Sequence, residues 1–360
     1  MIKGLVDTDS LPVGRWSQRA VRILAGESLL PHEAEEILSA PREEILELLS
    51  GAYRLRHHYF SNRVQLYFLV NAKSGICPED CHYCSQSKIS DAEIPKYKIL
   101  SEEELLEGAR RAAQLQSRTY CIVISGRSPT PQEMRTVTSV VPRIKKELGL
   151  HICACLGLLT PDLARELKAC GVDRVNHNLN TGEDHYEEIC TTHTYADRVE
   201  TLQAVRDAGL EMCSGGIIGM GEKAEHIVQM AFALRDLGVQ SIPVNFLNPI
   251  EGTPLETRHD LDPIRSLQAL AMFRFVNPDR EIRIAGGREI QLRSLQPLGL
   301  FAANSIFVGD YLTTKGQLPS RDYQMISDLG FQIVVRNEQG EEIVCDPPEV
   351  QADPLAIVSN

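Results

Sequence analysis

The sequence predicts an α/β fold, a (βα)8 barrel of the TIM type with an N-terminal helical extension. One observation is a series of short segments rich in β-branched and aromatic residues, separated by segments with helical periodicity. Another is a glycine between most helical segments and the next β-rich run, where helices commonly end. A length of 360 residues also suits one large barrel. An open doubly wound sheet is the alternative, because a sequence does not show whether a sheet closes.

The first predicted element is a helical cap that covers residues 1–60. Pro31 and Pro41 each stand where a first helical turn would begin, and the residues after them are rich in Glu, Ile and Leu. The eight predicted strands then cover residues 64–70, 119–125, 151–156, 173–179, 210–216, 240–247, 281–286 and 305–308. Parallel strands that alternate with helices in this way are typical of a closed barrel.

The predicted helices between the strands have recognisable ends. Ser101 and Glu104 form a capping box, and Thr160 followed by Pro161 is a second helix start. The predicted C-caps are Gly149, Gly171, Gly209 and Gly238. We therefore divide the chain into a helical extension (1–60), a barrel (61–330) and a peripheral C-terminal tail (331–360) with one strand at 331–335.

Composition narrows the class of protein. A net charge of −12, with the charges scattered along the chain, argues against nucleic acid or an anionic membrane as the main partner. The N-terminus carries acidic residues where a signal peptide needs an apolar stretch, and no run approaches the ~18–20 apolar residues of a membrane span. We expect a cytoplasmic protein, in which ten cysteines indicate metal binding or catalysis rather than disulfides.

Three cysteines follow the first predicted strand directly. Cys77, Cys81 and Cys84 have the spacing C-x3-C-x2-C, with Tyr83 before the last of them. Three thiolates on a [4Fe–4S] cluster leave one iron open to bind and activate another molecule. A zinc site that takes His82 as its fourth ligand is the alternative. Catalytic residues of such barrels gather at the C-terminal ends of the strands, which is where this triplet falls.

The predicted interior of the barrel is unusually polar. Side chains two residues apart on a strand point to the same side, so several Cys, Asn and Arg side chains are expected to face inward. These are Cys121, Cys153, Cys155, Asn176, Asn178, Asn180, Cys213, Asn245 and Arg283. Such a lining costs free energy unless it holds polar or metal cargo, because barrel interiors are usually packed with branched aliphatic residues.

Other features have ordinary structural explanations. We interpret Cys170, Cys190 and Cys345 as small buried residues, since a lone buried cysteine is more often packing than ligand. The glycine-rich residues 215–221 end the fifth predicted strand and suit close approach of the backbone to a flat ligand such as adenine.

These motifs together resemble a known family. The spacing of Cys77, Cys81, Tyr83 and Cys84 is similar to the cluster motif of the radical S-adenosylmethionine (SAM) superfamily, and the chain resembles its biotin synthase family over nearly the whole barrel. The resemblance lies in residues 71–81, 176–179, 213–216, 252–255, 286–289 and 303–307. Six separate motifs in the same order are more specific than the cysteine triplet alone.

The resemblance implies a role for each candidate residue. Cys77, Cys81 and Cys84 would hold the [4Fe–4S] cluster, and an auxiliary cluster, usually [2Fe–2S], would be held by Cys121, Cys153, Cys213 and Arg283. SAM would contact Tyr83, Ser125, Asn178, Asn180, Arg198 and Ile217, with Arg198 pairing its carboxylate. The ureido ring of dethiobiotin would contact Asn176, Asn245 and Thr313.

The implied reaction is sulfur insertion into dethiobiotin to give biotin. The [4Fe–4S] cluster would cleave SAM to a 5′-deoxyadenosyl radical, and the auxiliary cluster would supply sulfide to the carbon radical that forms. The implied partners are dethiobiotin, a flavodoxin or ferredoxin as electron donor, the Fe–S assembly machinery and a second copy of the chain in a homodimer. Two alternatives stay open: another radical SAM enzyme with a related barrel, and a non-catalytic Fe–S or zinc scaffold.

Two residues depart from the expected pattern. Asn180 stands where many members of the family have Asp, a modest change if the side chain binds a ribose hydroxyl. Cys155 is predicted to face the interior beside Cys153, one step nearer the active end. A guanidinium normally has no lone pair to donate, so Arg283 is a poor ligand and a thiolate would be a better one. Cys155 is therefore a candidate extra ligand, which would support a cluster larger than [2Fe–2S].

Overall fold

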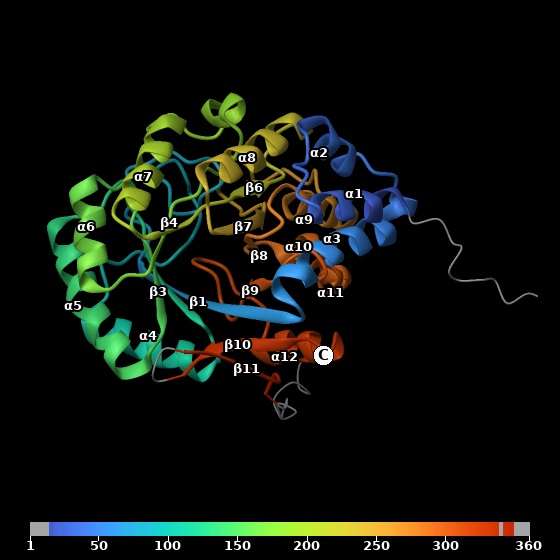
Figure 1. The fold of residues 1–360 in the computed structure, drawn as a ribbon. Helices are drawn as coiled ribbons and strands as arrows, with labels where there is room; N and C mark the ends of the chain where they lie inside the picture. The colour runs from blue at the N-terminus through green and yellow to red at the C-terminus, as the bar shows by residue number, and fades with distance from the viewer. Residues whose placement is uncertain (1–13, 338–340, 349–360) are drawn as a thin grey trace, which may run out of the picture.

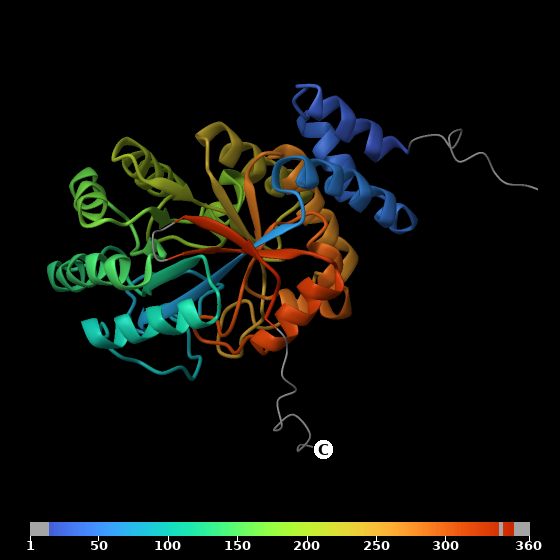
Figure 2. The same ribbon diagram turned by 60° about the horizontal axis from the view of Figure 1, so that its bottom comes forward.

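The computed structural model describes residues 14–337 and 341–348 and shows a closed parallel barrel (Figure 1). Its strands are β1 (Arg63–Lys73), β2 (Thr119–Ile124), β3 (His151–Cys155), β4 (Arg174–Asn176), β5 (Glu211–Cys213), β7 (Ser241–Phe246), β8 (Glu281–Ile284) and β9 (Ser305–Phe307). They pair in this order, and β9 pairs with β1 through Gln65↔Ser305 to Tyr67↔Phe307, which closes the ring. The predicted barrel is confirmed over the open sheet, and Figure 2 shows the same strands from a second direction.

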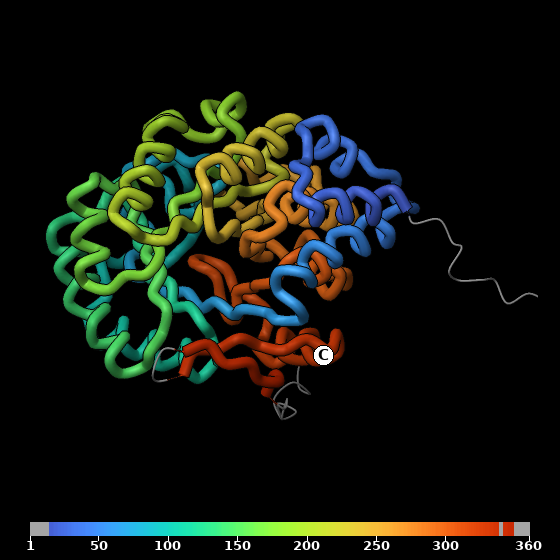
Figure 3. The backbone as a smooth tube through the Cα atoms, viewed as in Figure 1, coloured from blue at the N-terminus to red at the C-terminus, as the bar shows by residue number. Residues whose placement is uncertain are grey.

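Helices cover the outside of the barrel, as the tube in Figure 3 shows. The helices between strands are α4 (Glu102–Gln114), α5 (Pro131–Leu148), α6 (Pro161–Cys170), α7 (Tyr195–Asp207), α8 (Ala224–Leu237) and α9 (Pro263–Val276). Shorter helices follow β8 and β9: α10 (Arg288–Gln291), η4 (Arg293–Leu295), α11 (Gln296–Gly299) and α12 (Pro319–Asp328). Within residues 14–337 and 341–348, none of the helices combines the length and apolar character that crossing a bilayer requires.

The predicted helix ends explain where these helices start and stop. The Ser101 hydroxyl accepts a hydrogen bond from the backbone N–H of Glu104, and the Glu104 carboxylate accepts one from the Ser101 backbone N–H. Thr160 caps α6 in the same position. Gly149, Gly171 and Gly238 are C-caps in the left-handed conformation, and Gly209 lies one residue beyond the C-cap of α7 with φ +72°.

An N-terminal helical layer packs beside the barrel, as expected from the sequence. It consists of α1 (Arg15–Leu24), α2 (Pro31–Leu38), η2 (Arg42–Glu44) and α3 (Ile45–Phe60). Both α2 and α3 contact α9, and buried residues such as Trp16 and Leu48 belong to the same apolar core as the barrel. Residues 1–13 of the predicted extension lie outside the described residues.

The C-terminal segment adds two strands to the outside of the barrel sheet. β10 (Gln332–Arg336) runs parallel to the start of β1, and β11 (Glu342–Cys345) pairs antiparallel with β10. This matches the strand predicted at 331–335 and adds one that was not predicted. Residues 349–360 of the predicted tail lie outside the described residues, and the division of the chain into domains stays a prediction.

The fifth predicted strand, 210–216, is interrupted in the structure. β5 ends at Cys213, and the chain resumes as the short strand β6 (Gly216–Ile218), which pairs with β7 beyond the end of β5. A Cβ atom added to Gly215 would lie 1.9 Å from the carbonyl oxygen of Pro243 on β7. Only glycine fits here, because the chain passes close to β7. This course of the chain places β6 at the mouth of the barrel.

Candidate active site

A cavity of about 400 Å³ lies at the C-terminal ends of the barrel strands. It is lined by residues from the barrel strands, from β6 and from the loops that follow the strands. The predicted site residues that line it are Cys77, Cys81, Tyr83, Cys84, Cys121, Ser125, Cys153, Cys155, Asn176, Asn178, Asn180, Arg198, Ile217, Asn245, Arg283 and Thr313. Cys213 lies behind this wall, with its side chain wholly buried. One cavity therefore brings together nearly every residue predicted from the sequence.

The first thiol set, Cys77, Cys81 and Cys84, lies on the loop that follows β1. The backbone N–H of His82 donates to the carbonyl of Ile189 (2.9 Å), which ties this loop to the segment before α7. All three thiols are free, and burial raises the pKa of Cys84 to about 11. Three thiols without partners among themselves fit a cluster with one open iron, because a metal would hold each of them as thiolate.

The alternative zinc site with His82 finds no support. The only group of three Cys, His, Asp or Glu residues with ligand atoms close together, among the residues described, is Cys81, Cys190 and His193. His82 uses its backbone to hold the loop and does not belong to that group.

The second thiol set lies on strands β2, β3 and β5 inside the barrel. Cys121 on β2 is directly opposite Cys153 on β3, and both contact the buried Tyr67. The pKa of the Cys153 thiol is raised well above its ordinary value, first by the hydrogen bond with Cys121 and also by burial. Cys213 on β5 lies 3.7 Å from Arg283 Nη1 and 3.2 Å from Asn176 Nδ2.

Arg283 sits in a buried network of charges below these thiols. Its Nη2 donates to Glu281 Oε1 (2.9 Å) and to Ser241 Oγ (2.6 Å). Arg174 Nη1 donates to the other Glu281 oxygen (3.0 Å), and the Tyr67 hydroxyl donates to that same oxygen (2.8 Å). Burial raises the pKa of Glu281, but Arg174 and Arg283 outweigh it and hold that pKa well below the usual range of a carboxyl group.

The inner residues fit an auxiliary Fe–S cluster. Two buried thiols, Cys121 and Cys153, line the cavity and Cys213 lies behind its wall, beside a guanidinium whose Nε is buried and has no hydrogen-bond partner. A buried donor without a partner is uncommon, since most such groups are paired. Its position beside Cys213 and the cavity is consistent with a group that a cluster would contact.

Cys155 lies one step from the inner thiols, toward the open end. It is opposite Val123 across the β2–β3 register, lines the cavity and is half-buried. Burial, with a further contribution from Cys213, raises its pKa to about 12.

The SAM-side residues centre on Arg198, a buried guanidinium on α7. Its Nη1 donates to the carbonyl of Asn178 (2.7 Å), its Nε to the Tyr186 hydroxyl (2.5 Å) and its Nη2 to His193 Nε2 (2.8 Å). Three separate partners fix the guanidinium against the cavity wall. A fixed guanidinium is well suited to bind a carboxylate.

Asn180 completes this side of the cavity in an unusual conformation. Its φ of +72° lies in the left-handed region, which Asn tolerates better than most residues. With the amide oriented by its hydrogen-bond network, the oxygen accepts from Arg198 Nη2 (3.1 Å) and from the Tyr83 hydroxyl (2.5 Å). Because the chain turns here, β4 ends at Asn176, three residues before the predicted end of the strand.

Two further residues face the same space. The Ser125 hydroxyl at the end of β2 is buried without a hydrogen-bond partner, so it is free to bind a polar group. Ile217 on β6 lies opposite Asn245 on β7 and lends an apolar surface. Both positions suit contacts with the sugar and base of a nucleoside.

The proposed substrate residues are amides and a hydroxyl from three loops or strands. Asn176 Nδ2 donates to Asn178 Oδ1 (3.0 Å), and Asn245 Oδ1 accepts from the backbone N–H of Gly286 (3.0 Å). The hydroxyls of Thr313 and Ser85 are 2.8 Å apart, which joins the loop after β9 to the cluster loop. These contacts hold the polar groups around the cavity at fixed positions.

The glycine-rich residues 215–221 have a structural role that the sequence interpretation did not include. Gly215 is required by the carbonyl of Pro243, and a Cβ on Gly216 would lie 2.2 Å from Met230 Sδ. Close packing of the backbone against β7 and α8 therefore explains these two glycines without any ligand.

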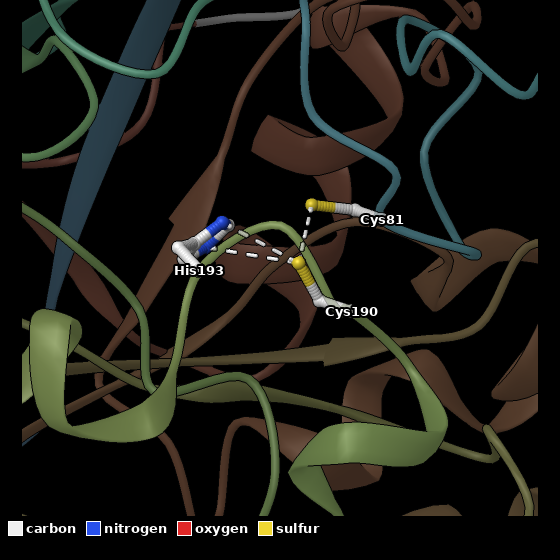
Figure 4. A group of neighbouring side chains, drawn as sticks. All are labelled: Cys81, Cys190 and His193. Atoms are coloured by element: carbon white, nitrogen blue, oxygen red, sulfur yellow. Dashed lines mark hydrogen bonds between the residues drawn. The ribbon is translucent and has the colours of Figure 1, made fainter.

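Sequence reasoning missed a group of residues beside the cluster loop. Cys190, interpreted above as a small buried residue, lies with its Sγ 3.8 Å from Cys81 Sγ and 3.4 Å from His193 Nδ1 (Figure 4). Glu79 Oε2 is 2.5 Å from His193 Nδ1, and Asp80 accepts from the backbone N–H groups of Thr191 and Thr192. The spacing of Cys190 and His193, C-x2-H, is the signal that could have drawn attention to this segment.

Family models match two parts of the chain. The model described as the radical SAM superfamily matches residues 72–234, which include the cluster loop and strands β2 to β6. The model described as the biotin and thiamin synthesis associated domain matches residues 243–332, from β7 to β10. The two matches together cover the strands and loops that build the cavity.

Relatives in three bacteria share more than half of their sequence with this chain. A biotin synthase of Rhodopirellula baltica is 62% identical over 322 residues, which cover 89% of this chain and 90% of the relative. A biotin synthase of Geobacillus kaustophilus is 56% identical, covering 89% of this chain and 96% of the relative. One of Bacillus subtilis is 53% identical with the same two coverages.

Solved structures with low sequence identity share the fold. A crystal structure of methylornithine synthase superposes with a TM-score of 0.78 at 19% identity, covering 89% of this chain and 98% of that one. An FeFe-hydrogenase maturase from Carboxydothermus hydrogenoformans gives 0.76 at 17% identity, with coverages of 89% and 80%. At these identities the likeness concerns the barrel architecture alone.

Proposed function

The chain belongs to the biotin synthase family, and on that basis we propose how its cavity residues carry out the family's reaction. It is an enzyme of the radical SAM type that inserts sulfur into dethiobiotin to give biotin. Its cofactors are a [4Fe–4S] cluster, SAM and an auxiliary Fe–S cluster. The observation that best supports the residue assignments is the single cavity lined by both thiol sets.

We assign the [4Fe–4S] cluster to Cys77, Cys81 and Cys84 and the auxiliary cluster to Cys121, Cys153, Cys213 and Arg283. When bound, these groups supply the electron that cleaves SAM to methionine and a 5′-deoxyadenosyl radical, and the sulfide that becomes the biotin sulfur. Cys155 is the candidate extra ligand of the inner cluster.

The protein's own contribution is to hold SAM in one pose. Arg198 presents a guanidinium fixed by three partners, which would pair the SAM carboxylate. The unpaired Ser125 hydroxyl and the turn at Asn178 and Asn180 would contact the nucleoside, with Tyr83 and Ile217 beside them. Fixed groups of this kind lower the entropy cost of bringing the reacting atoms together.

Dethiobiotin would lie between the SAM site and the inner thiols. Asn176, Asn245 and Thr313 come from β4, β7 and the loop after β9, so together they surround a small polar ring. The remaining wall includes the apolar side chains of Leu69, Val123 and Phe307, which keep water away from a reactive radical.

The partners follow from the same assignment. We propose that a flavodoxin or ferredoxin delivers the electron, that the Fe–S assembly machinery loads both clusters, and that the chain forms a homodimer in the cytoplasm. The family supports the electron donor, the assembly machinery and the homodimer. The net charge of −12 supports the cytoplasmic location. We also propose that residues 1–60, 61–330 and 331–360 are the helical extension, the barrel and a peripheral tail.

One experiment separates the two thiol sets. The wild-type chain and the variants Cys84→Ala and Cys153→Ala are reconstituted anaerobically with iron and sulfide, and both iron and sulfide are counted per chain. With reductant, SAM and dethiobiotin, the wild type should form 5′-deoxyadenosine and biotin. Cys84→Ala should form neither product. Cys153→Ala should still cleave SAM but lose at least 100-fold in biotin, because only the sulfur donor is missing.

Other outcomes would favour the alternatives. SAM cleavage without biotin in the wild type would indicate a related radical enzyme with another substrate. No SAM cleavage at full iron content would indicate a scaffold. If Cys153→Ala formed biotin at the wild-type rate, the assignment of the inner thiols would be wrong. For Cys155, a Cys155→Ser variant with unchanged Mössbauer spectra of the inner cluster would rule out a ligand.

A further inference from the structure

Three potential metal ligands, one from the cysteine motif and two from another segment, meet beside the cluster loop (Figure 4). Cys81 comes from the loop after β1, while Cys190 and His193 come from the segment between the 3-10 helix η3 (Glu183–Glu188) and α7. Their side chains point toward one another, and one ligand atom from each lies within 4.8 Å of the others. All three residues are buried, with exposed fractions of 8%, 1% and 7%.

The distances fit a tetrahedral metal ion. With metal–sulfur bonds of ~2.3 Å and metal–nitrogen bonds of ~2.0–2.1 Å, two sulfurs are ~3.8 Å apart and sulfur and nitrogen ~3.5 Å. Cys81 Sγ and Cys190 Sγ are 3.8 Å apart. Cys190 Sγ is 3.4 Å from His193 Nδ1 and 3.9 Å from Nε2. Two of the three ligand pairs are therefore within a few tenths of an ångström of tetrahedral spacing, and the third pair, Cys81 Sγ and the His193 nitrogen, lies within 4.8 Å.

The surroundings also suit a cation. The Glu79 carboxylate lies 2.5 Å from His193 Nδ1, so a proton on Nδ1 would leave the Nε2 lone pair available to the metal. Carboxylates orient metal-binding histidines in this way in many proteins. Asp80 Oδ1 is 3.3 Å from Cys190 Sγ and adds a second negative charge.

Only one contact has to be given up. His193 Nε2 now accepts a hydrogen bond from Arg198 Nη2 at 2.8 Å. A metal ion ~2.0–2.1 Å from Nε2 would lie where Nη2 now donates, so the Arg198 guanidinium has to turn away from His193, which leaves the Tyr186 hydroxyl and the Asn178 carbonyl as its acceptors. A metal ion at Nε2 would replace the lost partner of the imidazole.

We propose that the chain without its [4Fe–4S] cluster binds one thiophilic divalent ion, such as Zn²⁺, through Cys81, Cys190 and His193. Three protein ligands leave the fourth tetrahedral position to water. Because Cys81 can serve only one metal site, this ion and the [4Fe–4S] cluster exclude each other. The exclusion rests on the proposed cluster assignment of Cys81, whereas the Zn²⁺ site itself does not.

The test compares two cysteine variants that differ only in which site they remove. Full-length, reduced, cluster-free chain is titrated with Zn²⁺ against a chromophoric chelator under anaerobic conditions. A Cys153→Ser background removes one of the inner thiols and so weakens that set as a competitor for Zn²⁺. In that background, Cys190→Ser should weaken binding of the first Zn²⁺ at least tenfold. Cys84→Ser should leave it within twofold, because Cys84 belongs to the loop motif but not to this site.

X-ray absorption at the zinc edge provides a second measurement. The bound ion should show two sulfur neighbours and the outer-shell scattering of one imidazole, and His193→Gln should remove that scattering. Circular dichroism and heat unfolding check that Cys190→Ser is folded. If Cys84→Ser abolished binding and Cys190→Ser did not, Zn²⁺ would lie among the three loop thiols and the proposal would be wrong. Equal affinities in all variants, or no imidazole, would also overturn it.

The exclusion is measured separately by cluster loading. One equivalent of Zn²⁺, added before iron and sulfide, should lower [4Fe–4S] uptake severalfold in the wild type and much less in Cys190→Ser. If Zn²⁺ bound as expected but cluster uptake were unaffected, the Zn²⁺ site would stand and the assignment of Cys81 to the cluster would fail. If Zn²⁺ blocked loading equally in both chains, the exclusion through this site would be wrong.

Discussion

The two thiol sets of the cavity are held in different ways. Cys121 and Cys153 lie on neighbouring strands in direct register, wholly or nearly buried, above a network of buried charges. Cys77 and Cys84 lie on an irregular loop, are half-buried, and are held by hydrogen bonds between that loop and the segment before α7.

Because of this difference, substitutions around the two thiol sets should affect folding and activity to different degrees. Around the inner thiols, each residue that shapes the site also belongs to the barrel core, so a change there affects folding and activity together. Around the loop thiols, individual hydrogen bonds between two irregular segments hold the site, and single changes should alter binding more than folding. The predictions below test this contrast, beginning with the largest effect.

The buried Glu281 should be the most sensitive carboxylate. Replacing it by Gln keeps its shape but leaves the Arg283 guanidinium buried without a counter-charge, whereas Arg174 keeps its ion pair with Glu211. Breaking a buried ion pair in this way costs about 3–5 kcal/mol. The free energy of unfolding, measured with urea on cluster-free chain, should fall by that amount in Glu281→Gln. The matched loop variant Glu79→Gln should lose only about 1 kcal/mol, since its ionic partner Arg127 is 45% exposed and the Gln oxygen can still accept from His193 Nδ1.

The acid dependence of stability follows from the same network. The folded-state pKa of Glu281 lies well below the usual value, so its stabilisation is complete above the unfolded-state pKa of about 4.5 and is lost as the pH falls below it. Glu281→Gln should therefore be less sensitive to acid than the wild type over that range. If Glu281→Gln and Glu79→Gln shifted the urea midpoint equally, the contrast between the two regions would not hold.

Two glycines give the next comparison. Gly215→Ala would place a Cβ 1.9 Å from the backbone oxygen of Pro243, which cannot move without distorting β7. We expect a loss of about 3 kcal/mol, the upper end for overpacking. Gly75→Ala on the cluster loop meets only the flexible side chain of Lys96, and its φ of +70° costs about 1–2 kcal/mol. Urea unfolding of both variants should rank them in this order, and the reverse order would contradict the contrast.

Strand-borne residues of the site were predictable because strands are regular. The β-rich runs placed all eight barrel strands within a few residues, and period two placed Cys121, Cys153 and Asn245 toward the cavity that they line. The loop cysteines were found by their spacing, which needs no fold. The roles of all these residues stay predictions.

Residues on irregular segments were not predictable in the same way. Cys190 and His193 follow a short 3-10 helix, where no periodicity relates a position to a direction. The interruption between β5 and β6 depends on the close approach of Gly215 to β7, a contact between segments far apart in sequence. The left-handed turn at Asn180 was likewise hidden, because its Asn residues also fitted a continuous strand.

The smallest effect is expected for a replacement of Asn180 in the loop region. Asp shares the tolerance of Asn for the left-handed conformation at φ +72°, and its carboxylate can accept the same bonds from Arg198 and Tyr83. Asn180→Asp should therefore change the free energy of unfolding by no more than about 0.5 kcal/mol. Asn180→Ala loses those bonds and adds strain of about 1–2 kcal/mol.

Binding of SAM sharpens this prediction. Calorimetry on reconstituted enzyme should give Asn180→Asp a Kd within threefold of the wild type and Asn180→Ala a Kd about tenfold weaker, because Ala no longer helps to fix Arg198. A stable Asn180→Ala with unchanged SAM affinity would show that Arg198 is held by Tyr186, His193 and the Asn178 carbonyl alone. In that case the loop region would be as rigid as the inner barrel, and the contrast between the two regions would not hold.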